Sequence, residues 1–242
     1  MALGSIKRFA KDILAHMVYG HKSSEQRYVR WLRSQGMRIG EYVHLYSPWT
    51  IKVDTQRPWM VQIGNHVHIS ADCSILQHDY SWAVIQKLTG EVLGSCGRVV
   101  IGDNVFIGQK CLILKGAEIG DNSIVGAGSV VSGKLEGNAV YAGVPARKLM
   151  SLQDFIHKRR SAQYEEAKSL VMEYREIYGK DPDERLLREF FWLFASRDVH
   201  TLDPVFSAVL DLDGNGKSST SRWLESEPEF ASFQDFVDSL RN

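Results

Sequence analysis

The stretch Ile101-Gly102-Asp103-Asn104-Val105-Phe106-Ile107-Gly108 opens a repeat that is six residues long. An aliphatic residue recurs at every sixth position, at Ile101, Ile107, Ile113, Ile119, Val125 and Val131. Four places after an aliphatic residue comes a second small or apolar one, at Val105, Cys111, Ala117, Ser123 and Ser129. A period of six fits neither a helix nor a single strand. It is typical of short strands wound into a solenoid of triangular coils, with three hexads to each coil.

The same pattern is present earlier in the chain, with inward positions at Ile39, Leu45, Ile51, Ile63, Val67, Ile69, Cys73 and Ile75, which share one phase among themselves. The hexad that begins at Arg57 breaks the pattern, because Arg57-Pro58-Trp59 favours a bulge or a corner insertion over a strand. We therefore predict a mainly β fold, a left-handed parallel β-helix that covers residues 39–150.

The phase of the repeat also predicts a departure from the coil. Ile75 and Ile101 are 26 positions apart, which is not a multiple of six. Residues from about 76 to 100 are therefore expected to form an excursion loop. Loops held on a rigid scaffold often carry function, and this one contains His78, Asp79 and Glu91.

Helical segments flank the repeat. Residues 1–38 begin with a predicted amphipathic helix, whose apolar face includes Leu3, Ile6, Ala10, Ile13, Leu14, Met17 and Val18. We expect this helix to pack on its own or a neighbouring subunit, and contact with an anionic membrane surface is the alternative. Residues 151–242 form a predicted helical extension, in which one helix ends at Gly179 and Asp181-Pro182 and Asp203-Pro204 open further helices.

Composition narrows the class of protein. The 242 residues contain 29 Lys and Arg and 29 Asp and Glu, so no net charge draws the chain to nucleic acid. Three cysteines are too few for a disulfide framework and fit a reducing compartment. No transmembrane segment or signal peptide is recognisable. We expect a cytoplasmic protein.

The motifs Ile101–Gly108, Ile119-Gly120-Asp121-Asn122 and Ala142–Arg147 resemble the hexapeptide acyltransferase superfamily. The loop Gln77-His78-Asp79-Tyr80-Ser81-Trp82, with Gly90-Glu91, is similar to that of the sugar and polysaccharide O-acetyltransferases related to galactoside and maltose acetyltransferases. The resemblance covers about residues 39 to 150. It implies a homotrimer in which acetyl-coenzyme A lies between two subunits, and transfer of the acetyl group to a hydroxyl of a sugar-like or polysaccharide acceptor, with an amine as the alternative to the hydroxyl.

The resemblance places the catalytic histidine of the family at His78. The chemistry agrees, because an attacking hydroxyl must lose its proton and histidine suits that task near neutral pH. A carboxylate is expected to orient the imidazole. Glu91 and Asp79 compete for this role, and Glu91 is favoured because a Gly-Glu pair stands at about this place in galactoside-type loops.

For coenzyme A, the resemblance points to Gly108, Gly126 and Ala127, where small side chains let the pantetheine arm run along exposed backbone. Arg147 and Lys148 are expected to bind its phosphates. Tight corners of the coil are a second reason for the glycines.

Two other functions fit the same scaffold. His66, His68 and His78 suggest a zinc site like that of the γ-class carbonic anhydrases, although the ligand spacing of that family is not reproduced and we expect no metal. A non-catalytic trimeric assembly module is the other alternative.

Two further features are not expected to take part in function. Cys96 lacks an evident activator, and Asp211–Gly216 is expected to be a solvated turn rather than a calcium loop.

Overall fold

A computed structural model of the chain describes residues 13–241. The chain divides into two compact units, residues 1–155 and residues 156–242. The first unit holds the repeats and the second is helical. Of the predicted N-terminal amphipathic helix, Leu3, Ile6 and Ala10 lie outside the described residues. Residues 13–19 are helical, and the apolar side chains of Ile13, Leu14, Met17 and Val18 are exposed.

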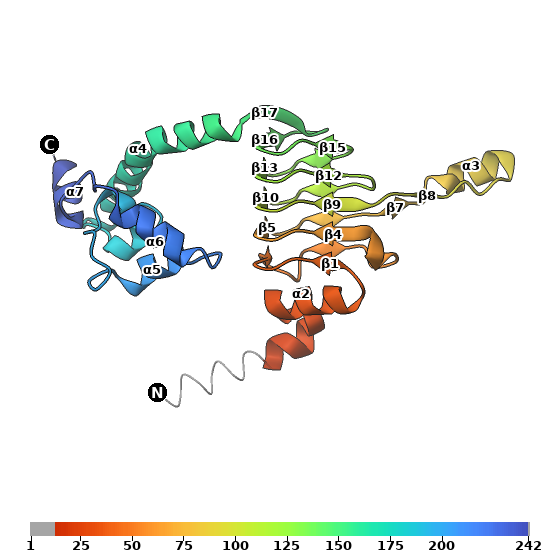
Figure 1. Cartoon of the computed structure of the whole chain (residues 1–242), viewed down its shortest axis with the longest axis horizontal. Helices are drawn as coiled ribbons and strands as arrows, with labels where there is room; N and C mark the ends of the chain where they lie inside the picture. The colour runs from red at the N-terminus through yellow and green to blue at the C-terminus, as the bar shows by residue number, and fades with distance from the viewer. Residues whose placement is uncertain (1–12, 242) are drawn as a thin grey trace. The chain divides into compact units, whose positions relative to one another are not determined.

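The first unit is a parallel β-helix, seen edge-on as a stack of coils in Figure 1. Each coil visits three parallel sheets in turn. The first sheet contains β1 (Arg38–Ile39), β4 (Val61–Ile63), β9 (Val99–Ile101), β12 (Glu118–Ile119) and β15 (Lys134–Leu135). The second contains β2 (His44–Leu45), β5 (Val67–Ile69), β10 (Val105–Ile107), β13 (Ser123–Val125), β16 (Ala139–Ala142) and the antiparallel β17 (Arg147–Ser151). The third contains β3 (Lys52–Val53), β6 (Ser74–Ile75), β11 (Leu112–Ile113) and β14 (Val130–Val131).

The hexad positions point into the coil as predicted. The aliphatic positions from Ile101 to Val131 and the second positions from Val105 to Ser129 are all at most 2% exposed. Their counterparts in neighbouring coils stack directly, because the registers of the parallel strands pair Ile63 with Ile101 and Ile75 with Ile113. The irregular hexad at Arg57 forms a short 3₁₀ helix, η2 (Pro58–Met60), in place of a strand. This agrees with the expected insertion at a corner of the coil.

The Gly-Asp-Asn corners explain the most regular motif of the sequence. The carboxylate of Asp121 accepts a hydrogen bond from the backbone N of Asp103 at 2.8 Å, which joins two coils. A Cβ on Gly102 would lie 2.2 Å from that carboxylate oxygen, so only glycine fits there. Asn104 and Asn122 have positive φ of 55°, which asparagine tolerates, and their side-chain amides are hydrogen-bonded at 2.8 Å.

Helical residues cover the N-terminal end of the coil. η1 (Gly20–Ser23) leads into α2 (Glu25–Ser34), which Ser24 caps by accepting from the backbone N of Arg27. Tyr28 and Leu32 of α2 are at most 1% exposed and belong to the same core as the coil. Burying these side chains closes the end of a solenoid whose first coil would otherwise expose its apolar interior.

Residues between the second and third coils leave the stack, where the phase of the repeat predicts a departure. They form a projecting arm made of β7 (His78–Asp79), α3 (Trp82–Thr89) and β8 (Ser95–Cys96) (Figure 1). The arm carries exposed apolar side chains, at Tyr80, Val84, Leu88, Val92 and Leu93. The expected loop therefore contains a helix and a two-stranded ribbon.

The second unit has an aromatic core built around Phe191, Phe194, Phe206, Trp223 and Phe236. Its elements are α4 (Leu152–Tyr178), which begins in the first unit, η3 (Glu184–Leu187), η4 (Phe191–Leu193), α5 (Pro204–Leu210), α6 (Gly216–Leu224) and α7 (Phe233–Ser239). Between residues 13 and 241, no helix is both long and apolar enough to cross a membrane.

Two of the three helix boundaries predicted in this unit are confirmed. α4 ends before Gly179, which has a φ of 65°, and Asp203 caps α5 by accepting from the backbone N of Val205 at 2.8 Å. The prediction for Asp181 is wrong, because η3 is capped by Asp183. The carboxylate of Asp181 instead binds Arg175 and Arg241.

Candidate active site

The root of the arm brings His78 against the coil. β7 and β8 pair antiparallel, with His78 opposite Cys96 and Asp79 opposite Ser95. The backbone N of Gly97 donates to the carbonyl of Gln77 at 2.8 Å, which closes the base of the ribbon. His78 therefore stands where the arm meets the coil and not at the far end of the arm.

Asp54, which directly follows β3, lies beside His78. Its Oδ2 is 2.5 Å from Nδ1 of the imidazole, and the side chains of His78 and Asp54 are 15% and 8% exposed. The two residues are 24 positions apart in sequence. They meet because β3 and β6 are neighbouring strands, with Val53 in register with Ile75. The sequence analysis missed Asp54. The feature that could have identified it is its position directly after a strand of the repeat, one coil before His78.

Further hydrogen bonds fix the Asp54 carboxylate and backbone. Its Oδ1 accepts from the backbone N of Gln56 at 3.0 Å. Its backbone carbonyl accepts from Nε2 of the fully buried Gln77 at 2.7 Å. The carboxylate thus has a defined orientation before any substrate binds, as an orienting group in an active site requires.

The pair has a clear chemical consequence. When Nδ1 carries the proton and donates it to Asp54, Nε2 keeps its lone pair and can accept a proton. The carboxylate also stabilises the imidazolium that forms after proton transfer. The ring of Tyr80 meets the imidazole edge-on, with centroids 5.3 Å apart. The arrangement is suited to a general base.

Neither carboxylate proposed from the sequence lies against His78 in the structure. Asp79 points to the other side of β7, where it binds Lys115 and accepts from the backbone N of Ser81 at 3.0 Å. Glu91 is exposed on the arm beyond α3, and its backbone N donates to Oγ1 of Thr89. The carboxylate that lies against His78 is that of Asp54, which the pairing of β3 with β6 brings there.

Cys96 has a neighbour that the sequence analysis did not foresee. Directly opposite residues of an antiparallel pair project from the same face, so the side chain of Cys96 shares a face with that of His78. Cys96 is exposed, whereas Cys73 and Cys111 are buried inward positions of the coil. The buried pair therefore acts as part of the core, as expected.

The residues expected to bind coenzyme A lie at other edges of the coil. Gly108 and Gly126 follow β10 and β13, at the corner between the second and third sheets. A Cβ on Gly108 would lie 2.5 Å from the backbone N of Ala127, so close stacking of coils explains this glycine. Arg147 and Lys148 are exposed on β17, which pairs with β16 of the second sheet.

His78 lies at a different corner, between the third and first sheets. One chain therefore does not gather His78 and the expected cofactor residues at a single edge. A site that contains both sets would need two chains side by side, each of which contributes a different edge.

The other histidines of the proposed zinc alternative have separate contacts. His66 stacks on Tyr42 at a corner of the coil, with ring centroids 5.0 Å apart. His68 lies on β5, and its Nδ1 is 2.8 Å from the hydroxyl of Tyr46. Within residues 13–241, no three His, Cys, Asp or Glu side chains are grouped so that they could hold a metal ion.

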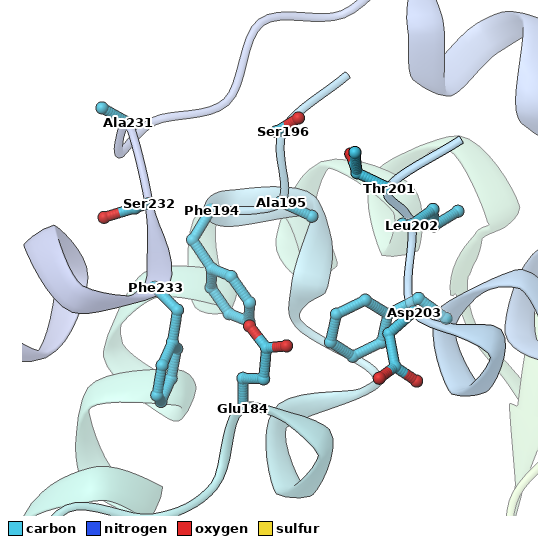
Figure 2. A pocket seen from close by; sticks show the side chains of 11 residues that line it. Glu184, Phe194, Ala195, Ser196, Thr201, Leu202, Asp203, Ala231, Ser232 and Phe233 are labelled. Atoms are coloured by element: carbon cyan, nitrogen blue, oxygen red, sulfur yellow. The ribbon is translucent and has the colours of Figure 1, made fainter. Parts of the chain in front are cut away.

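A depression of about 220 Å³ lies within the second unit, and Figure 2 shows its lining. The carboxylates of Glu184 and Asp203 and the rings of Phe194 and Phe233 face it. Asp203 is already engaged, because it accepts from Arg185 and from the backbone of α5. Among the residues that line it there is neither histidine nor cysteine.

Known proteins resemble this chain most clearly over the coil. Residues 98–133 match the family described as Bacterial transferase hexapeptide (six repeats). Protein CapG of Staphylococcus aureus is 38% identical over 148 residues, which cover 61% of this chain and 84% of CapG. Galactoside O-acetyltransferase of Escherichia coli K12 is 46% identical over 96 residues, which cover 40% of this chain.

The chain spans only 46% of the length of galactoside O-acetyltransferase. Among solved structures, a maltose O-acetyltransferase from Clostridium difficile 630 is similar with a TM-score of 0.44 and 22% identity, over 62% of this chain and 89% of that one. The coil, its repeats and the extent of the match to CapG lead to one conclusion: the chain belongs to the bacterial hexapeptide transferase family.

Proposed function

We propose that the protein transfers an acetyl group from acetyl-coenzyme A to a hydroxyl of a sugar or polysaccharide-type acceptor. The observation that carries the proposal is the pairing of His78 with Asp54 at the root of the arm, at 2.5 Å. It supplies a base with one free nitrogen. The names of the relatives support the reaction class, since galactoside O-acetyltransferase and a putative lipopolysaccharide biosynthesis O-acetyl transferase are among them.

In the proposed reaction, Nε2 of His78 takes the proton of the acceptor hydroxyl as its oxygen attacks the thioester carbon. Asp54 stabilises the resulting imidazolium. The tetrahedral intermediate collapses with cleavage of the carbon–sulfur bond, and the imidazolium returns its proton to the departing thiolate. The products are the O-acetylated acceptor and coenzyme A, and the histidine is restored.

A homotrimer of left-handed β-helices is part of the proposal. It is supported by the separation of His78 from Gly108, Gly126, Ala127, Arg147 and Lys148 onto different edges of one chain. Packing of two chains would bring the base of one beside the residues of the other that are expected to bind coenzyme A. Light scattering on the purified protein tests this, and a monomer at micromolar concentration would contradict it.

The three free cysteines support a cytoplasmic location for this reaction. We propose that Arg147 and Lys148 contact the phosphates of coenzyme A, where two exposed cations provide charge-assisted hydrogen bonds.

The test is acetyl transfer from acetyl-coenzyme A to a panel of free sugars, nucleotide sugars and polysaccharides, with wild type and His78→Ala compared. We expect His78→Ala to lower kcat by about 10² to 10⁴, the usual contribution of a positioned general base. Binding of coenzyme A, measured by calorimetry, should stay near the wild-type value. Turnover of His78→Ala within a few-fold of wild type would remove this residue from the mechanism.

A further inference from the structure

Lys115 joins the arm to the coil at a point the proposed reaction does not use. It lies in the turn between β11 and β12. Its ammonium group contacts the carboxylate of Asp79 on β7 and the hydroxyl of Ser95 on β8. Asp79 and Ser95 are opposite each other in the ribbon. A single cation from the coil therefore holds both strands of the arm at its base.

The contacts of Lys115 lie on the face of the ribbon opposite to His78. Successive side chains of a strand point to opposite faces, so Asp79 and Ser95 project away from the face of His78 and Cys96. Lys115 consequently has no place in the proton transfer itself. Its effect on His78 has to pass through the backbone of β7.

His78 is thereby fixed from two sides. Gln77, the residue before it, is tied to the coil that precedes the arm through the carbonyl of Asp54. Asp79, the residue after it, is tied to the coil that follows the arm through Lys115. Because both chain neighbours are held, the imidazole can keep its position beside Asp54 despite the long projecting arm.

The Asp79 carboxylate is committed to this anchoring role. Lys115 lowers its pKa, chiefly through the contact between the two side chains, and Ser81 adds to the effect by donating from its hydroxyl at 2.5 Å. The carboxylate therefore stays ionised throughout the neutral range. Together, the contacts of Asp79 tie the coil to the first residues of the arm helix.

We propose that Lys115 is a positioning residue of the acetyl transfer site, which clamps the base of the arm through Asp79 and Ser95 and so keeps His78 aligned with Asp54. This inference rests on the proposed function. The side chains of Lys115 and Asp79 are 33% and 41% exposed, and an ion pair so exposed adds little to global stability. Its importance lies in the geometry of one short segment, where a small displacement of a base strongly slows a reaction.

Lys115→Ala and Lys115→Arg test the clamp. We expect Lys115→Ala to lower kcat by about 10- to 100-fold while the KM for acetyl-coenzyme A stays within threefold. Amide hydrogen exchange of residues 78–96 should accelerate, and the melting temperature should not change measurably. Lys115→Arg should restore most of the lost turnover and protection, since a guanidinium can also donate to both partners.

Lys134→Ala is the matched control. Lys134, on β15, forms an exposed ion pair with Glu136 at 3.2 Å in which no residue of the arm takes part, so its removal should leave turnover and exchange unchanged. Unchanged exchange of residues 78–96 in Lys115→Ala would overturn the clamp, as would unchanged kcat. Failure of wild type to acetylate any acceptor would instead refute the proposed function, and exchange would still show whether Lys115 holds the arm.

Discussion

At the scale of single residues, two carboxylates at the root of the arm have different partners, and the proposals above give them different tasks. Asp54 is 8% exposed and touches the imidazole of His78, whereas Asp79 is 41% exposed and touches an ammonium group. Asp54 directly follows β3, and Asp79 is the second residue of β7. Glu91 has neither kind of contact among the described side chains.

Asp54→Asn should lower kcat by about 10² to 10⁴, because an amide can donate to Nδ1 and favour the tautomer whose Nε2 already carries a proton. The measurement is steady-state turnover with both substrates saturating. Glu91→Gln is the control, and its turnover should stay within threefold of wild type. A larger loss in Glu91→Gln than in Asp54→Asn would return the orienting role to Glu91.

At the scale of the elements, corners hold the coils together. The strands are only two to five residues long, so each provides few ladder hydrogen bonds. Side chains at the corners add bonds from coil to coil, as Asp121 does to the backbone of Asp103 and Asp103 does to that of Asn65 at 2.7 Å. Gly64 and Gly102 leave room for the carboxylates of Asp103 and Asp121 on the next coil.

Gly102→Ala should destabilise the protein by about 1–3 kcal/mol, because the new methyl group would displace the Asp121 carboxylate or shift the backbone. Thermal and urea unfolding provide the measurement. Gly94→Ala is the control, since a Cβ there would meet nothing within 4 Å, and its effect should be within about 0.5 kcal/mol. Equal stability of the two variants would contradict the steric explanation of the motif.

At the scale of the whole molecule, two units have separate cores. The core of residues 156–242 is aromatic, and a polar network closes it. Arg175, near the end of α4, donates to the carbonyls of Val237 and Leu240, and Asp181 bridges Arg175 and Arg241. This network fastens the last helix of the chain to α4.

Asp181→Asn should destabilise the second unit by about 1 kcal/mol at neutral pH, a modest value because the Asp181 side chain is 27% exposed. Arg175, and then Arg241, lower the pKa of Asp181 below its usual 3.8. A depressed carboxyl pKa stabilises the fold above the unfolded value and loses that effect as the pH falls through the folded one. The difference between wild type and variant should therefore shrink below about pH 3.8.

Calorimetric unfolding from pH 7 to pH 2.5 measures this difference, with the transition of the coil as the internal reference. If Asp181→Asn lowers the stability of the second unit by the same amount at every pH, the charge of Asp181 is not the cause of the lower stability. A shift of the coil transition instead would show that the two units do not unfold separately.

The sequence by itself determined the features that repeat or are local. A period of six marks the inward positions, because each coil buries the same places on its strands. The phase break between Ile75 and Ile101 marks the arm, and Gly179 and Asp203-Pro204 mark helix ends, since their backbone and capping preferences act within a few residues.

Only the tertiary structure decided which side chains meet. Asp54 reaches His78 and Lys115 reaches Asp79 through the stacking of coils, over separations of 24 and 36 residues. Each separation depends on the length of the intervening corners and of the arm, which no periodic pattern records. Asp181 likewise binds Arg241 from 60 residues away instead of capping a helix. At these places a charged side chain pairs with an oppositely charged group that folding brings close to it, and this interaction outweighs the local preference for a cap or a turn.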